Sequence, residues 1–135
     1  EYVNSAKNTS YNLLIQNTIS ASKTYYEECE YGDLSDSSKY GSYACKINNN
    51  TIATTLGTLA NTGMLTVSDV DPNNKDKKVV LDPRDTTKDM SACQITITKV
   101  KSNIKDDNGI TSNKVTYKVE ASSGNNCPTT EEYKK

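Results

Sequence analysis

The sequence predicts an α+β fold in which one long N-terminal helix packs across an antiparallel β-sheet. Three observations favour this class. The first 31 residues contain neither Gly nor Pro, and they carry apolar residues at helical spacing. Two β-rich segments flank Asn108 and Gly109, a pair that favours a tight hairpin turn. Four widely spaced cysteines favour disulfide bonds that would stabilise the fold.

Length and composition narrow the classes of protein further. A chain of 135 residues fits a single domain, 1–135. The net charge of −1 provides no basic surface, so we expect no nucleic-acid partner. The absence of His removes Ser–His and Cys–His catalytic pairs and the commonest metal ligand. We therefore expect no enzyme of these two classes, and the carboxylate clusters, considered below, are not expected to be catalytic either.

The segment 1–31 is predicted to be a helix that ends at Gly32 in a left-handed residue. Val3 and Ala6 continue its apolar stripe toward the N-terminus, and no capping residue precedes the stripe. Either the first turns of an ordinary amphipathic helix fray, or the helix once extended further upstream. The chain begins at Glu1 rather than Met, which suggests a processed product. The main stripe consists of Tyr11, Leu14, Ile15, Thr18, Ala21, Ser22, Tyr25 and Cys29.

The segment 32–92 is predicted to be a connecting region with one short helix and one short strand. The helix covers 51–60, with Ile52, Leu56 and Leu59 on one face. A semi-extended segment over 64–70 should pack against the core. The strand is formed by the apolar residues 79–81. We predict no internal repeat.

The segment 93–135 is predicted to form a hairpin sheet and a C-terminal loop, with strands over 94–104 and 110–122. If Asn108 and Gly109 form a two-residue turn, Val100 lies opposite Tyr117. This register points Ile95 and Ile97 to solvent unless one extra residue intervenes, so we predict a bulge near residues 98–99. The helix should pack against Val100, Val115, Tyr117 and Val119.

The cysteines form no Cys-x-x-Cys pair, which argues against zinc and against a thioredoxin-like site. Four cysteines allow three disulfide pairings. We favour Cys29–Cys45, which closes a short loop after the helix, and Cys93–Cys127, which ties the C-terminal segment to a strand. Both bonds imply an oxidising, extracellular location.

The organisation of the chain resembles that of type IV pilins and pseudopilins. The N-terminal segment EYVNSAKNTSYNLLIQNTISASKTYYEECEYGD resembles the soluble half of the pilin helix, and LGTLANTGMLTVSDVDP resembles the passage between helix and sheet. Cys93 and Cys127 resemble the disulfide that closes the C-terminal loop of many pilins. The likeness in the helix is carried by Ala6, Lys7, Leu13, Leu14, Ala21, Tyr25 and Tyr26.

This resemblance implies a structural subunit of an extracellular type IV pilus on a bacterial surface, which serves adhesion or motility. Its partners would be other pilin subunits, and a host-surface receptor would be a further partner. A missing apolar half of the helix would anchor the precursor in the membrane and then drive non-covalent assembly. Tyr2, Val3 and Ala6 would form an assembly surface that neighbouring subunits cover.

Two alternatives stay open: a type II secretion pseudopilin, and another secreted calcium-binding or adhesion module. Asp69, Asp71 and Asn73 copy the first three ligand spacings of an EF-hand loop. Asn74 replaces the glycine that this loop requires, and Val80 stands where the bidentate Glu belongs. We therefore assign no metal and no cofactor, and keep these three residues as Ca²⁺ candidates. The cluster of Glu27, Glu28 and Glu30 is expected to be a solvated helix face rather than a catalytic site.

Overall fold

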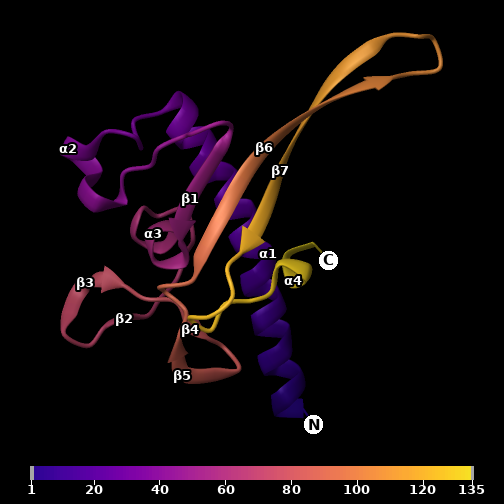
Figure 1. The fold of residues 1–135 in the computed structure, drawn as a ribbon. Helices are drawn as coiled ribbons and strands as arrows, with labels where there is room; N and C mark the ends of the chain where they lie inside the picture. The colour runs from indigo at the N-terminus through magenta and orange to yellow at the C-terminus, as the bar shows by residue number, and fades with distance from the viewer. Residues whose placement is uncertain (1, 135) are drawn as a thin grey trace.

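The computed structural model describes the backbone of residues 2–134 and the side chains of residues 5–134. It is an α+β fold in which one long helix lies along a three-stranded antiparallel sheet, with two small hairpins below the sheet (Figure 1). The order of strands in the sheet is β1-β6-β7. The main elements are α1 (Tyr2–Tyr31), β1 (Thr51–Thr55), α3 (Leu56–Asn61), β2 (Val70–Asp71), β3 (Asn74–Lys78), β4 (Leu81–Asp82), β5 (Asp85–Asp89), β6 (Gln94–Lys105), β7 (Thr111–Ala121) and α4 (Thr130–Lys134).

Helix α1 buries the predicted stripe from Tyr11 onward, except that Leu14 is only half-buried. Two polar members of the stripe are satisfied within the helix. Thr18 donates a hydrogen bond to the Leu14 carbonyl (2.8 Å), and Ser22 donates one to the Thr18 carbonyl (2.7 Å). These bonds allow a stripe that is poor in large apolar residues to face the core.

The predicted left-handed end at Gly32 is wrong. The Gly32 N–H donates to the Glu28 carbonyl (3.0 Å), which continues the helical hydrogen bonding, and its φ lies outside the left-handed region. Glycine is nevertheless suited to this position. A Cβ there would lie 2.9 Å from the Glu28 carbonyl oxygen.

The predicted helix over 51–60 is also wrong in its first half. Thr51–Thr55 is strand β1, which pairs antiparallel with β6 from Thr98 to Gln94. Its β-branched residues fit a sheet edge, where side chains pack on a pleated surface. Only Leu56–Asn61 is helical, and Thr55 caps it by accepting a hydrogen bond from the Thr58 N–H (3.1 Å).

The long hairpin of β6 and β7 has one continuous register and no bulge. Gly109 has a φ of +79° and donates its N–H to the Asp106 carbonyl (3.0 Å), while the Asp106 N–H donates to the Ile110 carbonyl. The turn therefore contains three residues, 107–109, rather than two. This places Val100 opposite Thr116 instead of Tyr117, and the predicted bulge is unnecessary.

The register decides which apolar residues reach the core. Ile95 and Ile97 are paired with Ala121 and Val119, and they face α1 without any irregularity. Val100 and Val115 lie further out along the hairpin and are exposed, so the predicted burial of the α1 stripe against these two residues is wrong, although Val115 borders a groove beside Ile19 of α1. At these positions β6 and β7 have diverged from α1 (Figure 1).

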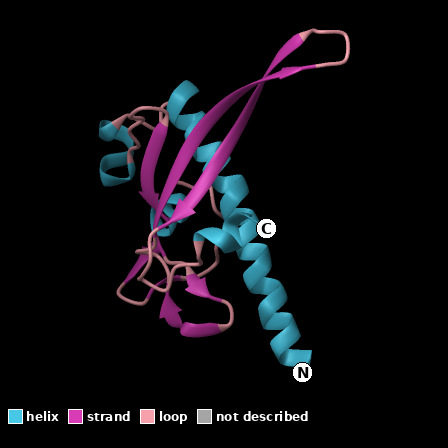
Figure 2. Cartoon of the chain, turned by 45° about the vertical axis from the view of Figure 1, so that its right-hand side comes forward, coloured by secondary structure: helices cyan, strands magenta, loops and turns pink. Residues whose placement is uncertain are grey.

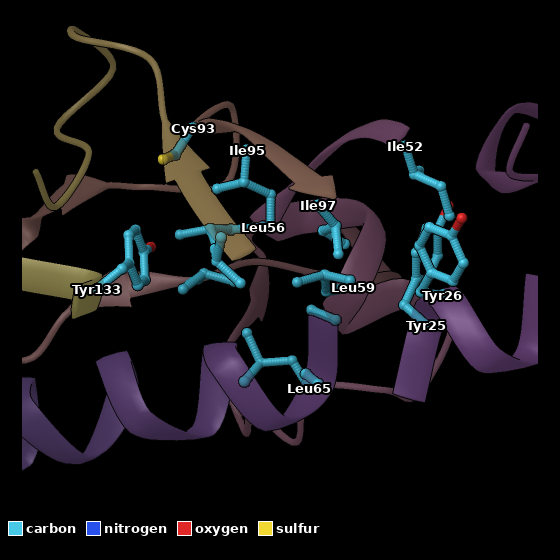
Figure 3. Packing of buried hydrophobic residues seen from close by; sticks show 14 of the residues in the cluster. Tyr25, Tyr26, Ile52, Leu56, Leu59, Leu65, Cys93, Ile95, Ile97 and Tyr133 are labelled. Carbon is cyan, nitrogen blue, oxygen red and sulfur yellow. The ribbon is translucent and has the colours of Figure 1, made fainter. Parts of the chain in front are cut away.

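The core lies between α1, α3 and the lower part of the sheet (Figure 3). Its centre is almost entirely aliphatic, with two adjacent tyrosines at the end nearest β1. Among its fully buried side chains are Tyr25, Tyr26, Ile52, Leu56, Leu59, Leu65, Ile95 and Ile97.

The two small hairpins are a tandem repeat of eleven residues that we did not predict. In the first hairpin, β2 and β3 pair Val70 with Lys78 and Asp71 with Asn74. In the second, β4 and β5 pair the residues eleven positions later, Leu81 with Asp89 and Asp82 with Asp85. Backbone hydrogen bonds repeat at the same interval, from the Val79 N–H to the Asp69 carbonyl and from the Met90 N–H to the Val80 carbonyl.

The repeat corrects the prediction for 64–70 and for 79–81. Val79 and Val80 are buried but lie outside the strands. They connect the end of β3 to the start of β4, where the chain passes from one hairpin to the next. Leu65 packs in the core as predicted, whereas Val70 is exposed on the first hairpin.

Candidate assembly surface and disulfide bonds

The N-terminal part of α1 is uncovered by the rest of the chain. Residues 5–10 are all exposed, including Ala6, and Tyr11 is the first buried side chain of the helix from residue 5 onward. In Figures 1 and 2 this end of α1 runs clear of the sheet. The side chains of Tyr2 and Val3, the other two predicted assembly residues, lie outside the described residues.

A polar cluster fixes α1 at the point where it leaves the body. The guanidinium of Arg84 stacks on the Tyr11 ring, and it donates two hydrogen bonds to the buried Asp82, from Nε (3.1 Å) and Nη2 (2.9 Å). Burial, together with the neighbouring Glu132 carboxylate, raises the pKa of Tyr11 to about 12. The phenol therefore stays neutral beside these charges.

Helix α4 holds Glu132 in place at this cluster through a capping box. Thr129 accepts a hydrogen bond from the Glu132 N–H through its Oγ1 (3.1 Å), and its own N–H donates to Glu132 Oε1 (3.0 Å). The sequence Thr-x-x-Glu is a recognisable signal of this motif, which our predictions missed. The cluster thus joins α1, β4 and α4.

A second cluster fixes the other end of α1 to the base of the long hairpin. Lys99 on β6 is almost fully buried and forms an ion pair with Glu30 (2.7 Å). Its ammonium group lies 5.9 Å from the ring centre of Tyr26 and 5.8 Å from that of Tyr31. The hydrogen bond from Lys99 lowers the pKa of Glu30. The Tyr117 ring completes the cluster, 5.3 Å from Tyr26.

The two disulfides follow the favoured pairing. Cys29–Cys45 links the last turns of α1 to the loop before β1, and Cys93–Cys127 links the start of β6 to the segment before α4. No described cysteine is free. Because disulfides persist in oxidising compartments, the two bonds indicate an extracellular or secreted protein.

The Ca²⁺ candidates do not converge. Asp69 and Asn73 are exposed, and Asp71 Oδ1 accepts a hydrogen bond from the Asn73 N–H (2.8 Å) in the turn between β2 and β3. Within the described part of the chain, no three side chains of Asp, Glu, Cys or His lie together as metal ligands. Glu27 and Glu28 are exposed on α1.

The outer half of the long hairpin forms a free-standing ribbon, defined here as residues 100–116. It projects from the end of the molecule opposite the N-terminus of α1 (Figure 2). Four large apolar residues are exposed on it, and a groove of about 300 Å³ opens where β7 diverges from α1, between Ile19 and Val115. The four exposed residues are Val100, Ile104, Ile110 and Val115.

The chain matches no family model, no curated protein and no solved structure. None of the helices in the described range is both long enough and apolar enough to cross a membrane. Arguments about function therefore depend on the site itself.

Both clusters that hold α1 were missed by reasoning from the sequence. The only arginine of the chain follows Asp82 and Pro83, a pattern that indicates a turn but not the distant partner Tyr11. Lys99 and Glu30 are 69 residues apart, and no local pattern connects them.

Proposed function

We propose that this chain is the structural subunit of an extracellular filament of the type IV pilus kind, and that it catalyses no reaction. In such a filament, the N-terminal half of the long helix packs among the helices of neighbouring subunits, and the globular part coats the fibre. The observation that carries the proposal is the division of α1. Residues 5–10 are uncovered, whereas the stripe from Tyr11 to Cys29 is packed into the body.

The way in which α1 is held supports a mechanical role. The Tyr11–Arg84 cluster fixes the helix where it leaves the body, and the Cys29–Cys45 disulfide fixes its last turns. A force applied along the exposed end would be transmitted to the sheet through these contacts. The two disulfides also suit a fibre outside the cell, where reduction is rare.

Immunogold electron microscopy of the native cells tests this function. Antibodies raised against residues 5–134 should decorate thin surface filaments along their length, and deletion of the gene should remove those filaments. A variant of the full-length protein with Ala6→Asp should accumulate without assembling, because a carboxylate would be placed in the helix packing. Lys46→Asp, at an exposed loop position, is the matched control. Labelling confined to dispersed protein would contradict the proposal.

A further inference from the structure

A groove of about 540 Å³ opens beside α3, where four segments of the chain meet. Its walls come from η1 (Gly41–Tyr43), from the junction of β1 and α3, from the end of β3, and from the segment 89–92 that leads from β5 toward β6. In Figure 1, α3 and β3 mark its place on the left of the molecule. Ligand pockets have volumes of about 300–1,000 Å³, so the groove is large enough for a small organic molecule.

Both disulfides adjoin the groove. Tyr43 lies two residues before Cys45, and Ala92 directly precedes Cys93. The first bond ties the η1 wall to α1, and the second ties the 89–92 wall to the C-terminal segment. Two of the four walls are therefore held by covalent links.

Hydrogen bonds join α3 to the other walls. The Asn61 side chain accepts a hydrogen bond from the Lys78 N–H (2.8 Å) and donates one to the Lys78 carbonyl (2.9 Å). The Gly57 N–H donates to the Ser91 carbonyl (2.9 Å), and a Cβ at residue 57 would lie 3.0 Å from that oxygen, so glycine allows this close approach. A ligand would thus meet walls that are formed before it binds, which reduces the entropic cost of binding.

The hydroxyl groups of the lining can donate further hydrogen bonds. Ser91 Oγ accepts a hydrogen bond from the Val80 N–H (2.8 Å), and Thr58 Oγ1 accepts one from Thr55 Oγ1 (3.0 Å). Each acceptor hydroxyl keeps its own hydrogen for another partner. Ser42 adds an exposed hydroxyl on the opposite wall. The groove therefore offers donors to a ligand that is rich in oxygen acceptors.

The charge of the lining favours an anion. Lys77 and Lys78 are exposed, and neither is part of an ion pair within residues 5–134. Asp89 is the acidic residue of the lining, and its Oδ1 already accepts a hydrogen bond from the Ser91 N–H (2.8 Å). Two ammonium groups thus face one carboxylate, and charge-assisted hydrogen bonds to a bound anion would be the strongest contacts in the groove.

A saccharide that carries a carboxylate meets these requirements. Its carboxylate would pair with an ammonium group, its hydroxyl oxygens would accept hydrogen bonds from the serine and threonine hydroxyls, and its C–H faces would pack on the apolar surface of Tyr43 and Ala92. An inorganic anion supplies acceptors but fills little of the volume. A nucleic acid needs an extended basic surface, which a chain with a net charge of −1 lacks.

We propose that this groove binds a carboxylate-bearing saccharide, with Lys77 and Lys78 at the carboxylate. The two disulfides indicate an extracellular or secreted protein, which would meet such saccharides in surface polysaccharides. The groove belongs to a single copy of the chain, so this binding is independent of filament assembly.

Titration of the dispersed 135-residue chain, followed by ¹H–¹⁵N NMR, tests the site. The probe is digalacturonic acid, and the neutral disaccharide galactobiose is its matched control because it lacks the carboxylates. Sodium sulfate serves as a second control for a simple anion. We expect digalacturonic acid to shift the amide signals of Ser42, Thr58, Lys77 and Ser91, and to bind at least tenfold more tightly than galactobiose or sulfate.

Substitutions then distinguish this groove from a general attraction to lysines. The double variant Lys77→Gln and Lys78→Gln should weaken the binding of digalacturonic acid at least tenfold, since it removes the charged donors. The double variant Lys105→Gln and Lys114→Gln removes the same charge from exposed positions of the ribbon and should leave the affinity unchanged. Ser42→Ala should weaken binding about threefold through one lost hydrogen bond. Unchanged melting temperatures establish that the variants are folded.

Four outcomes would overturn the proposal. They are no binding of digalacturonic acid up to about 10 mM, signal shifts centred outside the groove, sulfate binding as tight as that of the saccharide, and equal weakening by the two double variants. None of them bears on the filament, which the microscopy described above tests separately.

Discussion

The guanidinium carbon of Arg84 lies 3.4 Å from the centre of the Tyr11 ring. The planar group also meets both carboxylate oxygens of Asp82, which is almost completely buried. One side chain therefore neutralises a buried charge and covers Tyr11, where the burial of α1 begins among its described side chains. Arginine is suited to both roles, because its flat, delocalised charge stacks on aromatic rings while it forms paired hydrogen bonds.

Arg84→Ala should lower the free energy of unfolding by about 2–3 kcal/mol, because it leaves the Asp82 carboxylate buried without its partner. Arg84→Lys should recover only part of this loss, since an ammonium group cannot stack and pair at the same time. Urea denaturation measures both values. Lys39→Ala breaks the exposed ion pair with Asp33 and is the control, with an expected loss below about 1 kcal/mol.

The same pair predicts a pH dependence. Burial raises the pKa of Asp82, but the hydrogen bonds from Arg84 outweigh it and hold this pKa below its usual value of 3.8. The pair therefore stabilises the wild type above about pH 4, and this contribution is lost as the pH falls through the lowered pKa. Arg84→Ala removes the side-chain hydrogen bonds and the charge of Arg84, so the pKa of Asp82 should rise relative to the wild type, although the backbone N–H of residue 84 still donates to this carboxylate.

The difference in melting temperature between the wild type and Arg84→Ala should thus be largest near neutral pH. It should shrink as the pH falls through the lowered pKa of Asp82, below 3.8, because the carboxylate then becomes neutral in the wild type as well. Thermal melts between pH 3 and pH 7 measure this difference. A difference in melting temperature that stays constant over this pH range would show that Arg84 acts through packing alone.

Two neighbouring residues of α1 provide a matched test of how the helix packs. Ile15 is 5% exposed and Leu13 is 54% exposed. Ile15→Ala should cost about 2–4 kcal/mol through lost burial and a residual cavity. Leu13→Ala should change stability by less than about 0.5 kcal/mol in the dispersed chain. Equal losses in chemical denaturation would contradict the packing described here.

The two disulfides should differ in their effect on stability. They close loops of 16 and 34 residues in sequence separation. Limiting the entropy of the unfolded chain then contributes about 3 kcal/mol for Cys29–Cys45 and about 4 kcal/mol for Cys93–Cys127. Double Cys→Ser variants, compared by urea denaturation, measure the two values. Hydrogen exchange should also show faster opening of α4 only when Cys93–Cys127 is removed.

Gly109→Ala should loosen the ribbon without unfolding the body. Nothing lies within 4 Å of a Cβ at this position, so the cost arises only from its φ of +79°. This cost is about 1 kcal/mol. Hydrogen exchange should accelerate in 100–116 and remain unchanged in β1. An equal acceleration in β1 would indicate that ribbon and body unfold together.

Reasoning from the sequence predicted the long helix, its buried stripe, the long hairpin and the cysteine pairing. These features depend on local periodicity and on spacing along the chain. The hairpin register failed for one reason: a three-residue turn was taken as a two-residue turn. A register shift of one residue moves every side chain of a strand to the other face. The predicted bulge was therefore needed only to correct the wrong turn length.

The other differences arise from tertiary contacts. The segment from Thr51 to Thr55 is rich in β-branched residues but is too short to form a strand alone, and pairing with the edge of β6 makes it one. The partners of Arg84 and Lys99 lie on distant elements, so no spacing could identify them. The tandem repeat, in contrast, was detectable. Val-Asp-Pro at 70–72 and Leu-Asp-Pro at 81–83 occur eleven residues apart.

The two units of the repeat can be compared directly, because they have the same strand pairing and different neighbours. In both, an Asp side chain accepts a hydrogen bond from the N–H two residues later, from Asn73 in the first unit and from Arg84 in the second. In the second unit, the Arg84 side chain reaches Tyr11 on α1, and the corresponding residue of the first unit is the shorter Asn73. The first unit is held by α3 instead, where the Asn61 side chain accepts a hydrogen bond from the Lys78 N–H (2.8 Å) and donates one to the Lys78 carbonyl (2.9 Å). Because each unit returns the chain to the start of the next, insertion of one further unit should leave the sheet and the helix where they are.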